Sequence, residues 1–257
     1  MAVQQKKQQR EVFYDFKLNR ELEITKRALV QAKEAILFGE IRCIVGNSGV
    51  GKSKAIEVVR EKYPNNTFIV KCRKGMRKNR FMMEVLKQFG VNKRMSYDDA
   101  VDELKDRLNK GMLLIIDEPE HITIEAIEGI RYLNDETGCA VLFIGLPEFI
   151  SYIKSHRRQY EYVYNRINMN YHAKNMSVKD YEKLLESENI DIKYAPLLHE
   201  LSSVDTGKER VAVTRFLRSI LRTVILQCIE QNIDMENEKE MIKLFRATSK
   251  KLEVNIR

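Results

Sequence analysis

The stretch that most constrains this chain is a glycine-rich loop, Gly46-Asn47-Ser48-Gly49-Val50-Gly51-Lys52-Ser53. It follows an apolar run over 41–45 and precedes a helix-like segment over 54–62, so the pattern predicts a strand, a loop and a helix start. Glycines let backbone N–H groups face inward, and the helix N-terminus adds partial positive charge, which together favour a bound anion. In a nucleotide site of this type, Lys52 contacts the β and γ phosphates and the Ser53 hydroxyl ligates Mg²⁺.

Length and composition set further limits. A chain of 257 residues suits one large α/β domain, or a main domain with a small appendage. It contains no apolar stretch of membrane-spanning length and no signal peptide, so we expect a cytoplasmic protein that does not contact a membrane. The four cysteines lie far apart without a CxxC pair, which predicts reduced thiols rather than a metal cluster. The net charge of +8 suits a polyanion partner, although a cytoplasmic protein can also be basic without one.

The order of patterns along the chain predicts its organisation. Residues 1–11 form a flexible basic arm, because they are polar and lack periodicity. Strand-like and helix-like segments alternate over 12–175, which predicts an α/β nucleotide-binding domain with a parallel sheet sandwiched by helices. From Ser177 onward the segments are helix-like and no strand-like run separates them. Residues 176–257 are therefore expected to form a small helical domain with a C-terminal tail.

A second element of the site is the acid pair Asp117-Glu118, which follows the apolar run 113–116. A strand that is apolar on both faces belongs inside a parallel sheet, and its carboxyl end borders the crevice where such sheets bind ligands. There Asp117 would hold Mg²⁺ and Glu118 would polarise the water that attacks the γ-phosphate. The alternative is a strand end with two solvated acids. For the neighbouring His121, contact with phosphate or a bound polymer and a plain surface role both stay open.

At this point the chain resembles the AAA+ ATPases over about residues 12–225. The resemblance is carried by GNSGVGKS, LLIIDE, the strand VLFIGLPEF and a helical tail that contains Gly207-Lys208-Glu209-Arg210. It implies a P-loop NTPase fold with a small C-terminal all-helical lid, and ATP and Mg²⁺ as cofactors. By the same resemblance, Arg210 opens a lid helix and contacts the ATP of its own subunit.

The resemblance also implies an arginine finger that completes the site of a neighbouring subunit. Arg166 has the matching position, with Arg157 and Arg158 as rivals and a surface salt bridge as the alternative for Arg166. The chain departs from the family at the end of the fourth strand, where Gly145-Leu146 replaces the usual polar sensor-1 residue. The segment from Val12 to Phe16 resembles the one that packs on adenine, but it is equally consistent with plain core.

Within this family, IIDEPEHI followed by VLFIGLPEF looks most like the DNA-transposition ATPases of the MuB, TnsC and IstB type. Such proteins form ring or helical homo-oligomers with ATP on double-stranded DNA, mark the target and recruit or stimulate a transposase. Two other functions stay open. One is another DNA-remodelling AAA+ ATPase, such as a helicase loader, and the other is a signalling NTPase switch that binds only protein.

A basic cluster follows the second predicted strand. We expect it to form a flexible loop that contacts DNA phosphates, which would give salt-sensitive affinity without base specificity. The alternative is a solvated charged loop, which is what most charge runs are. The six cations of the cluster are Lys71, Arg73, Lys74, Arg77, Lys78 and Arg80.

Overall fold

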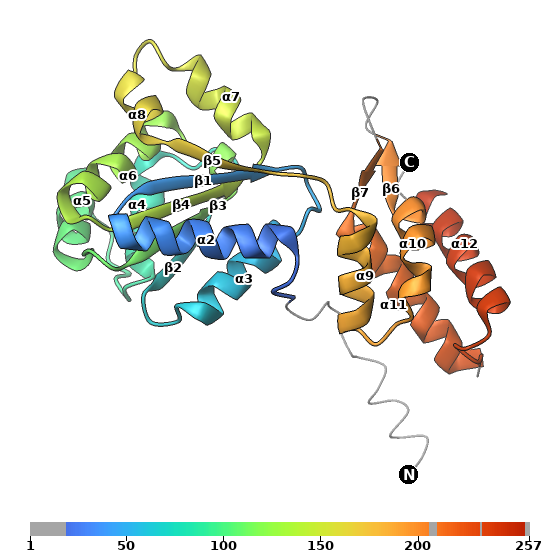
Figure 1. Cartoon of the computed structure of the whole chain (residues 1–257). Helices are drawn as coiled ribbons and strands as arrows, with labels where there is room; N and C mark the ends of the chain where they lie inside the picture. The colour runs from blue at the N-terminus through green and yellow to red at the C-terminus, as the bar shows by residue number, and fades with distance from the viewer. Residues whose placement is uncertain (1–18, 206–209, 232, 255–257) are drawn as a thin grey trace. The chain divides into compact units, whose positions relative to one another are not determined.

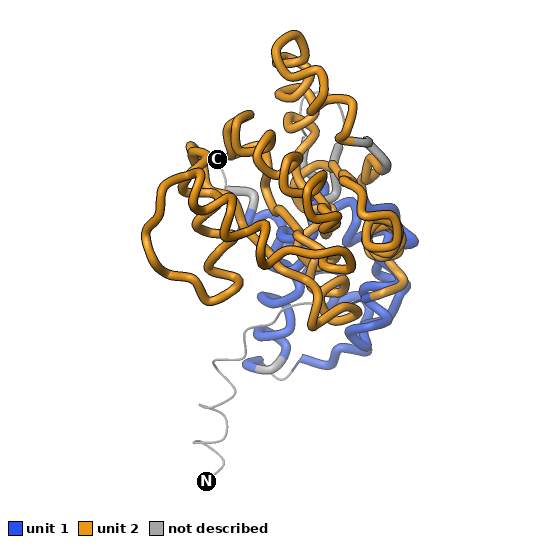
Figure 2. The backbone as a smooth tube through the Cα atoms, turned by 90° about the vertical axis from the view of Figure 1, so that its left-hand side faces the viewer, with its two compact units in different colours: residues 1–19, 176–257 blue, residues 20–175 orange. Residues whose placement is uncertain are grey.

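The structure, a computed structural model, describes residues 19–205, 210–231 and 233–254. These residues divide between two compact units, one of residues 20–175 and one that contains residues 176–257 (Figure 2). Asn19 belongs to the second unit, where its side-chain amide donates a hydrogen bond to the Lys183 carbonyl at 2.9 Å. The predicted basic arm and the Val12 to Phe16 segment lie outside the described residues.

The first unit is built on a five-stranded parallel sheet (Figure 1). β3 and β4 are buried along their whole length, as their apolar sequences predict. β5 forms an edge of the sheet, where it pairs only with β1 among the described strands. The strands, in their order across the sheet, are β2 (Thr67–Lys71), β3 (Leu113–Asp117), β4 (Ala140–Gly145), β1 (Ile41–Gly46) and β5 (Asn168–Ala173).

Helices cover both faces of this sheet, as the sequence predicts. On one face α2 packs closely, because its residues Ala28, Ala32 and Ala35 are small and fully buried. On the other face the core is formed by large side chains, among them Phe81, Met82 and Phe143. The helices are α2 (Glu23–Phe38) and α3 (Lys52–Lys62) on the first face, and α4 (Lys78–Lys87), α5 (Tyr97–Arg107) and α6 (Ile124–Thr137) on the second (Figure 1).

Local sequence signals mark three of the helix boundaries. Gly39 ends α2 in the left-handed conformation with φ of 68°, which L side chains rarely adopt. Ser96 caps α5, because its side chain accepts a hydrogen bond from the Asp99 backbone N–H at 3.2 Å. Ser177 caps the first helix of the second unit and forms a reciprocal capping box with Asp180.

Two helices follow β4 in the first unit, α7 (Pro147–Ser155) and α8 (Glu161–Arg166). The sequence predicts α7, because Phe149, Ile150 and Ile153 repeat at helical spacing and are buried. It does not predict α8, which is too short to display a periodicity and buries only Val163. The α8 helix matters here because Arg166 is its last residue.

The second unit is mainly helical, and it also contains a small sheet that the sequence does not predict. The strands β6 (Ser203–Asp205) and β7 (Arg210–Ala212) pair antiparallel. Three-residue strands are too short to show an alternating pattern, so the expectation of an all-helical domain was wrong in this respect. The other elements are α9 (Val178–Ser187), the 3-10 helix η3 (Ile192–Tyr194), α10 (Ala195–Leu201), α11 (Thr214–Gln231) and α12 (Glu238–Val254).

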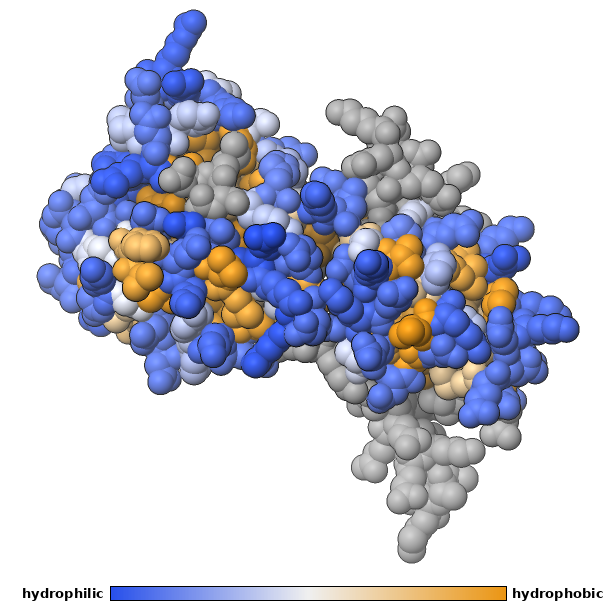
Figure 3. Space-filling view, in the orientation of Figure 1, coloured by the Kyte–Doolittle hydropathy of each residue, from blue (hydrophilic) through white to orange (hydrophobic). Residues whose placement is uncertain are grey.

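The described residues include no helix that is long and apolar enough to cross a membrane. Figure 3 shows a largely hydrophilic surface, interrupted by apolar residues on the face where α2 lies, and exposed Val30, Leu37 and Phe38 belong to this helix. All four cysteines are buried and unpaired, and burial raises the pKa of the Cys139 thiol to about 12. In the described part of the chain, no cluster of His, Cys, Asp and Glu is arranged to hold a metal ion.

Candidate nucleotide-binding site

The glycine-rich loop connects the end of β1 to the start of α3, as predicted. Gly51 is the N-cap of α3 and has φ of 97°, a conformation that favours glycine. Gly46 leaves no room for a side chain, because a Cβ there would lie 2.6 Å from the Cβ of Ala173 in β5. The loop leads into the N-terminus of an 11-residue helix, where an anion is stabilised.

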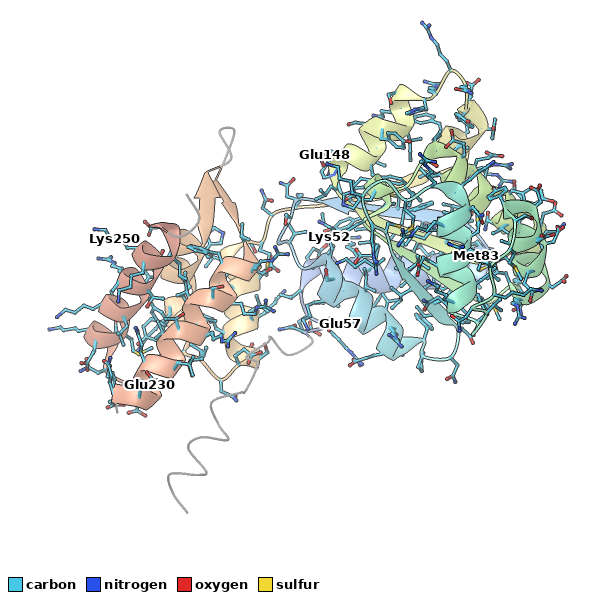
Figure 4. All side chains as sticks on the ribbon, turned by 180° about the vertical axis from the view of Figure 1, so that it is seen from behind. Lys52, Glu57, Met83, Glu148, Glu230 and Lys250 are labelled. Atoms are coloured by element: carbon cyan, nitrogen blue, oxygen red, sulfur yellow. The ribbon has the colours of Figure 1, made fainter. Side chains whose placement is uncertain are left out.

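Lys52 folds back over this loop. Its ammonium group donates hydrogen bonds to the carbonyl oxygens of Gly46 at 2.6 Å and Asn47 at 2.8 Å. Burial lowers the pKa of Lys52, while nearby carboxylates act in the opposite direction, Glu120 most strongly. Figure 4 labels Lys52 at the start of α3 and Glu148 in α7, one of the other carboxylates that act on it. The ammonium group thus lies among acids that come from several separate elements.

Asp117 ends β3 at the same edge of the sheet, and Glu118 directly follows it. The register pairs Val45 with Gly145 and Asp117 with Ile144, so the carboxyl ends of β1, β4 and β3 lie together. Asp117 is buried, and burial raises the pKa of its carboxyl group. Glu118 has φ of 57°, an uncommon left-handed conformation that turns the chain into the 3-10 helix η2 (Pro119–His121).

Glu120 is a site residue that the sequence analysis missed. Its carboxylate accepts a hydrogen bond from the Leu146 backbone N–H at 3.2 Å, just beyond the end of β4. A Cβ at Gly145 would collide with this carboxylate and with the Pro119 ring. Glu120 therefore occupies the space beside Gly145-Leu146, where the resembled family usually has its polar sensor-1 residue. Two features of the sequence could have revealed this role: Glu120 is a further acid two residues after Glu118, and Gly145 stands at the end of a predicted strand.

Lys71 is the last residue of β2, and the register places it opposite Asp117. Its ammonium nitrogen lies 3.4 Å from Glu118 Oε1 and 3.9 Å from Asp117 Oδ2. The lysine side chain is nevertheless 63% exposed, whereas that of Asp117 is 12% exposed. A residue predicted only as a DNA contact thus also pairs with both site acids.

The rest of the basic cluster leads from β2 into α4. Arg73, Lys74, Arg77, Lys78 and Arg80 are all exposed. The cluster does not form the freely flexible loop that we expected. Its last basic residues belong to α4, which begins at Lys78, and its residues Cys72 and Met76 are buried.

Hydrogen bonds tie this loop to the segment that follows the site acids. The Met76 N–H donates to the His121 carbonyl at 3.2 Å, and Met76 forms a parallel β-bridge with Ile122. The Cys72 N–H donates to the Asp117 carbonyl at 2.9 Å. The cations therefore stand on a support that is anchored to the acid pair.

The three candidate finger arginines lie in or near α8. Arg166 is 60% exposed and pairs with Asp135 of α6 at 2.7 Å. Arg157 pairs with Glu161 at 3.7 Å, and Arg158 lies exposed in the turn between α7 and α8. Within the described chain, no hydrogen bond or ion pair joins these three arginines to Lys52 or to the site acids. The choice among them as a finger stays a prediction.

Arg210 does not open a helix. It begins β7, and α11 starts four residues later at Thr214, so the expected helix start was wrong. The sequence did not reveal this, because β7 lies within residues 208–228, a stretch whose pattern predicts a helix. Gly207, Lys208 and Glu209 lie outside the described residues, as does the position of the Arg210 side chain. The phosphate-contacting role of Arg210 remains a prediction.

The first unit combines a parallel sheet of order β2-β3-β4-β1-β5 with a glycine-rich loop after β1 and an acid pair after β3. This arrangement, with helices following in a second unit, is the AAA+ fold, as the sequence resemblance implied. Residues 39–153 match the family model described as AAA domain.

One known protein has a related sequence, and its description is consistent with the AAA domain. The chain is 26% identical over 145 residues to the Mu-like prophage FluMu DNA transposition protein B of Haemophilus influenzae. That match covers 54% of this chain and 49% of the relative, so the chain spans about half the length of the curated relative that it matches.

Two solved structures share the fold at low sequence identity. The Aeropyrum pernix ORC2 protein, described as ADPNP-ADP complexes, has a TM-score of 0.66 and 14% identity, over 93% of this chain and 71% of that chain. Drosophila ORC bound to DNA has a TM-score of 0.56 and 10% identity, over 93% of this chain and 63% of that chain. At these identities the likeness concerns the fold alone.

Proposed function

We propose that this protein is an ATP-dependent, DNA-binding AAA+ ATPase that forms homo-oligomers on double-stranded DNA. In that state it would mark a transposition target and recruit or stimulate a transposase. The observation that carries the proposal is the connection between the basic loop and the acid pair, through Lys71, Glu118 and the Met76 backbone. The distant relative described as a DNA transposition protein supports the specific role.

The nucleotide would bind at the loop of residues 46–53. Backbone N–H groups and the N-terminus of α3 supply an anion site, and Lys52 supplies a charge that is held near the phosphate position. Adenine nucleotides are favoured because the Aeropyrum protein of the same fold is described with ADPNP and ADP.

Mg²⁺ fits the donor groups of this site. Asp117 and the Ser53 hydroxyl are hard oxygen donors, the kind that Mg²⁺ prefers. Four carboxylates also act electrostatically on Lys52, those of Glu120, Asp117, Glu118 and Glu148. Their negative charge exceeds the positive charge of the lysine, and a divalent cation would neutralise the excess. When bound with nucleotide, the ion would reduce the charge on the phosphates.

Hydrolysis would depend on Glu118 as the base that accepts a proton from the attacking water. We assign Arg166, donated by a neighbouring subunit, to stabilise the developing phosphate charge, and Arg210 to contact the nucleotide of its own subunit. Arg157 and Arg158 are the rivals of Arg166. In this scheme nucleotide binding promotes assembly, and hydrolysis releases the subunits.

Double-stranded DNA would bind through the basic loop. Arg73, Lys74, Arg77, Lys78 and Arg80 are exposed and stand on an anchored segment. Contacts of this kind position a protein on phosphates without reading bases, so binding should weaken steeply with salt. Lys71 is the first cation of the same loop, so bound DNA would act directly on the residue that pairs with Glu118.

The test is the variant Glu118→Gln, which keeps the shape of the side chain and removes the base. With ATP, Mg²⁺ and duplex DNA, it should form long-lived DNA-bound oligomers that electron microscopy and size-exclusion chromatography detect. The matched control Glu148→Gln alters another acid near Lys52 and should release DNA as the wild type does. If Glu118→Gln stays monomeric with ATP and DNA, the mechanism is wrong.

The same preparation separates the rival functions. A helicase loader would prefer single-stranded DNA and bind a replicative helicase stably. A protein-only switch would bind no duplex at low salt, and neutralising the loop cations would change nothing. For the transposition role, adding the transposase should direct insertion to the DNA that carries the oligomer.

A further inference from the structure

The α12 helix of the second unit carries a straight row of cations, which we call the α12 ridge. Its members are spaced by four, three and four residues, so at 3.6 residues per turn they share one narrow face of the helix. The opposite face holds the buried residues Met241, Phe245 and Thr248. Figure 4 shows Lys250 on the outer side of α12, where side chains extend away from the unit. The ridge consists of Lys239, Lys243, Arg246 and Lys250.

These four cations are exposed, and none forms an ion pair with another described residue. The acids in the first turn of α12 are already engaged, since Glu238 pairs with Lys193 at 3.5 Å and Glu240 accepts a hydrogen bond from Asn237 at 3.2 Å. The ridge ends at Lys250, because the next residue on this face is the acid Glu253.

Exposed cations on α2 and α5 are arranged differently. In α2, Arg27 pairs with Glu23, and in α5, Arg107 pairs with Glu103, each across one helical turn. Opposite charges at this spacing stabilise a helix, whereas like charges destabilise it. The α12 ridge therefore weakens its own helix when it faces only water, and an anionic ligand would remove that repulsion.

We propose that the α12 ridge binds the phosphate backbone of double-stranded DNA, as a contact separate from the basic loop of the first unit. This inference rests on the proposed function, which supplies duplex DNA as the partner. The ridge is about 16 Å long at about 1.5 Å per residue, which corresponds to about five phosphates of one strand. The described side chains of α12 include no exposed large hydrophobic residue, so the ridge lacks the apolar anchor typical of a protein interface.

The experiment neutralises the ridge in the full-length chain with Lys239→Gln, Lys243→Gln, Arg246→Gln and Lys250→Gln together. Binding to a fluorescent duplex of mixed sequence is measured with a non-hydrolysable ATP analogue over a range of salt concentrations. We expect at least a tenfold loss of affinity near about 0.1 M salt, and a log–log salt slope smaller by about 3 to 4. Thermal unfolding should occur at an equal or higher temperature than in the wild type, because the like-charge repulsion is gone.

The matched control removes the same charge from cations that are already paired. It combines Lys26→Gln, Arg27→Gln, Lys105→Gln and Arg107→Gln, whose partners include Glu21, Glu23, Glu136 and Glu103. This variant has the same net charge as the ridge variant and should keep the salt slope of the wild type within about one unit.

The inference is overturned if the ridge variant binds duplex DNA with the affinity and salt slope of the wild type. It is also overturned if the control loses as much affinity, because net charge alone then explains the effect. In both cases the proposed function stands if binding still requires the nucleotide and the loop cations. If the wild type binds no duplex with the ATP analogue, both the inference and the proposed function fail.

Discussion

The ammonium group of Lys71 lies 3.4 Å from the carboxylate of Glu118; Lys71 ends β2, and Glu118 directly follows the neighbouring strand β3. Lys71 is also the first cation of the basic loop. One residue therefore pairs with the proposed catalytic base and opens the surface proposed to bind DNA. The ion pair engages Glu118 Oε1, so this oxygen must leave Lys71 before it can orient an attacking water.

Removing this lysine should release Glu118. We expect Lys71→Ala to raise ATP hydrolysis in the absence of DNA by several fold, and to reduce the further stimulation by duplex DNA. The effect is smaller than that of removing a catalytic group, because the pair is largely exposed and therefore weak. A steady-state phosphate-release assay with and without duplex measures both quantities.

The control for this prediction is Lys74→Ala, which removes an exposed lysine from the same loop. It should leave DNA-free hydrolysis unchanged while weakening DNA binding slightly. Equal DNA-free rates for Lys71→Ala and Lys74→Ala would show that the contact with Glu118 has no influence on hydrolysis.

Asp117 should make the stability of the protein depend on pH. Burial raises the pKa of this carboxyl group above its ordinary value of 3.8. Between the ordinary and the raised pKa the folded state binds more protons than the unfolded state, so this contribution to stability falls as pH rises through that window. Asp117→Asn should therefore be more stable than the wild type at neutral pH, by on the order of 1 kcal/mol.

Urea denaturation at a series of pH values measures this difference without nucleotide or Mg²⁺. The advantage of Asp117→Asn should disappear below the ordinary pKa of 3.8, where the carboxyl group is protonated in both states. The exposed control Asp106→Asn should change stability by less than about 0.5 kcal/mol at every pH. An advantage of Asp117→Asn that persists at low pH would contradict the electrostatic explanation.

Glu120 should stabilise the end of β4. In Glu120→Ala the backbone N–H of Leu146 loses its acceptor, so we expect the free energy of unfolding to fall by about 1–2 kcal/mol. Glu120→Gln keeps an oxygen acceptor at the same distance along the chain and should lose less than half of that amount. Equal losses in the two variants, measured by urea denaturation, would mean that this hydrogen bond does not contribute.

Arg166 offers two roles that can be separated. If Arg166 is a finger donated to a neighbouring subunit, Arg166→Ala should lower ATP hydrolysis by roughly 10³-fold without weakening nucleotide binding. As a partner of Asp135 only, its removal should cost less than about 1 kcal/mol of stability and leave hydrolysis intact. The control is Asp135→Ala, which breaks this ion pair together with the one that Asp135 forms with Arg131.

Mixing variants tests whether the arginine acts between subunits. Arg166→Ala keeps an intact loop, and Lys52→Ala keeps an intact arginine, so mixed oligomers should recover hydrolysis that neither variant has alone. If the mixture stays inactive, and Arg158→Ala instead loses hydrolysis without weaker nucleotide binding, the finger is Arg158. This arginine is exposed in the α7–α8 turn.

Local patterns account for what the sequence predicted correctly. Apolar runs and helical spacing depend on neighbouring residues, so they revealed β1, β3, β4 and most helices of the first unit. The loop of residues 46–53 was predictable because a phosphate cradle needs glycines at close spacing and a helix start. Short elements such as α8, β6 and β7 show no such pattern, and they were missed.

Contacts between segments that are distant in the sequence depend on the order of the strands in the sheet. The sequence by itself determined a phosphate-binding loop, an acid pair at a strand end and a basic cluster. Only the tertiary structure placed β2 beside β3, which brings Lys71 to Glu118, and folded η2 back so that Glu120 reaches Leu146. Strand order and register arise from packing over the whole core, and no short stretch of sequence encodes them.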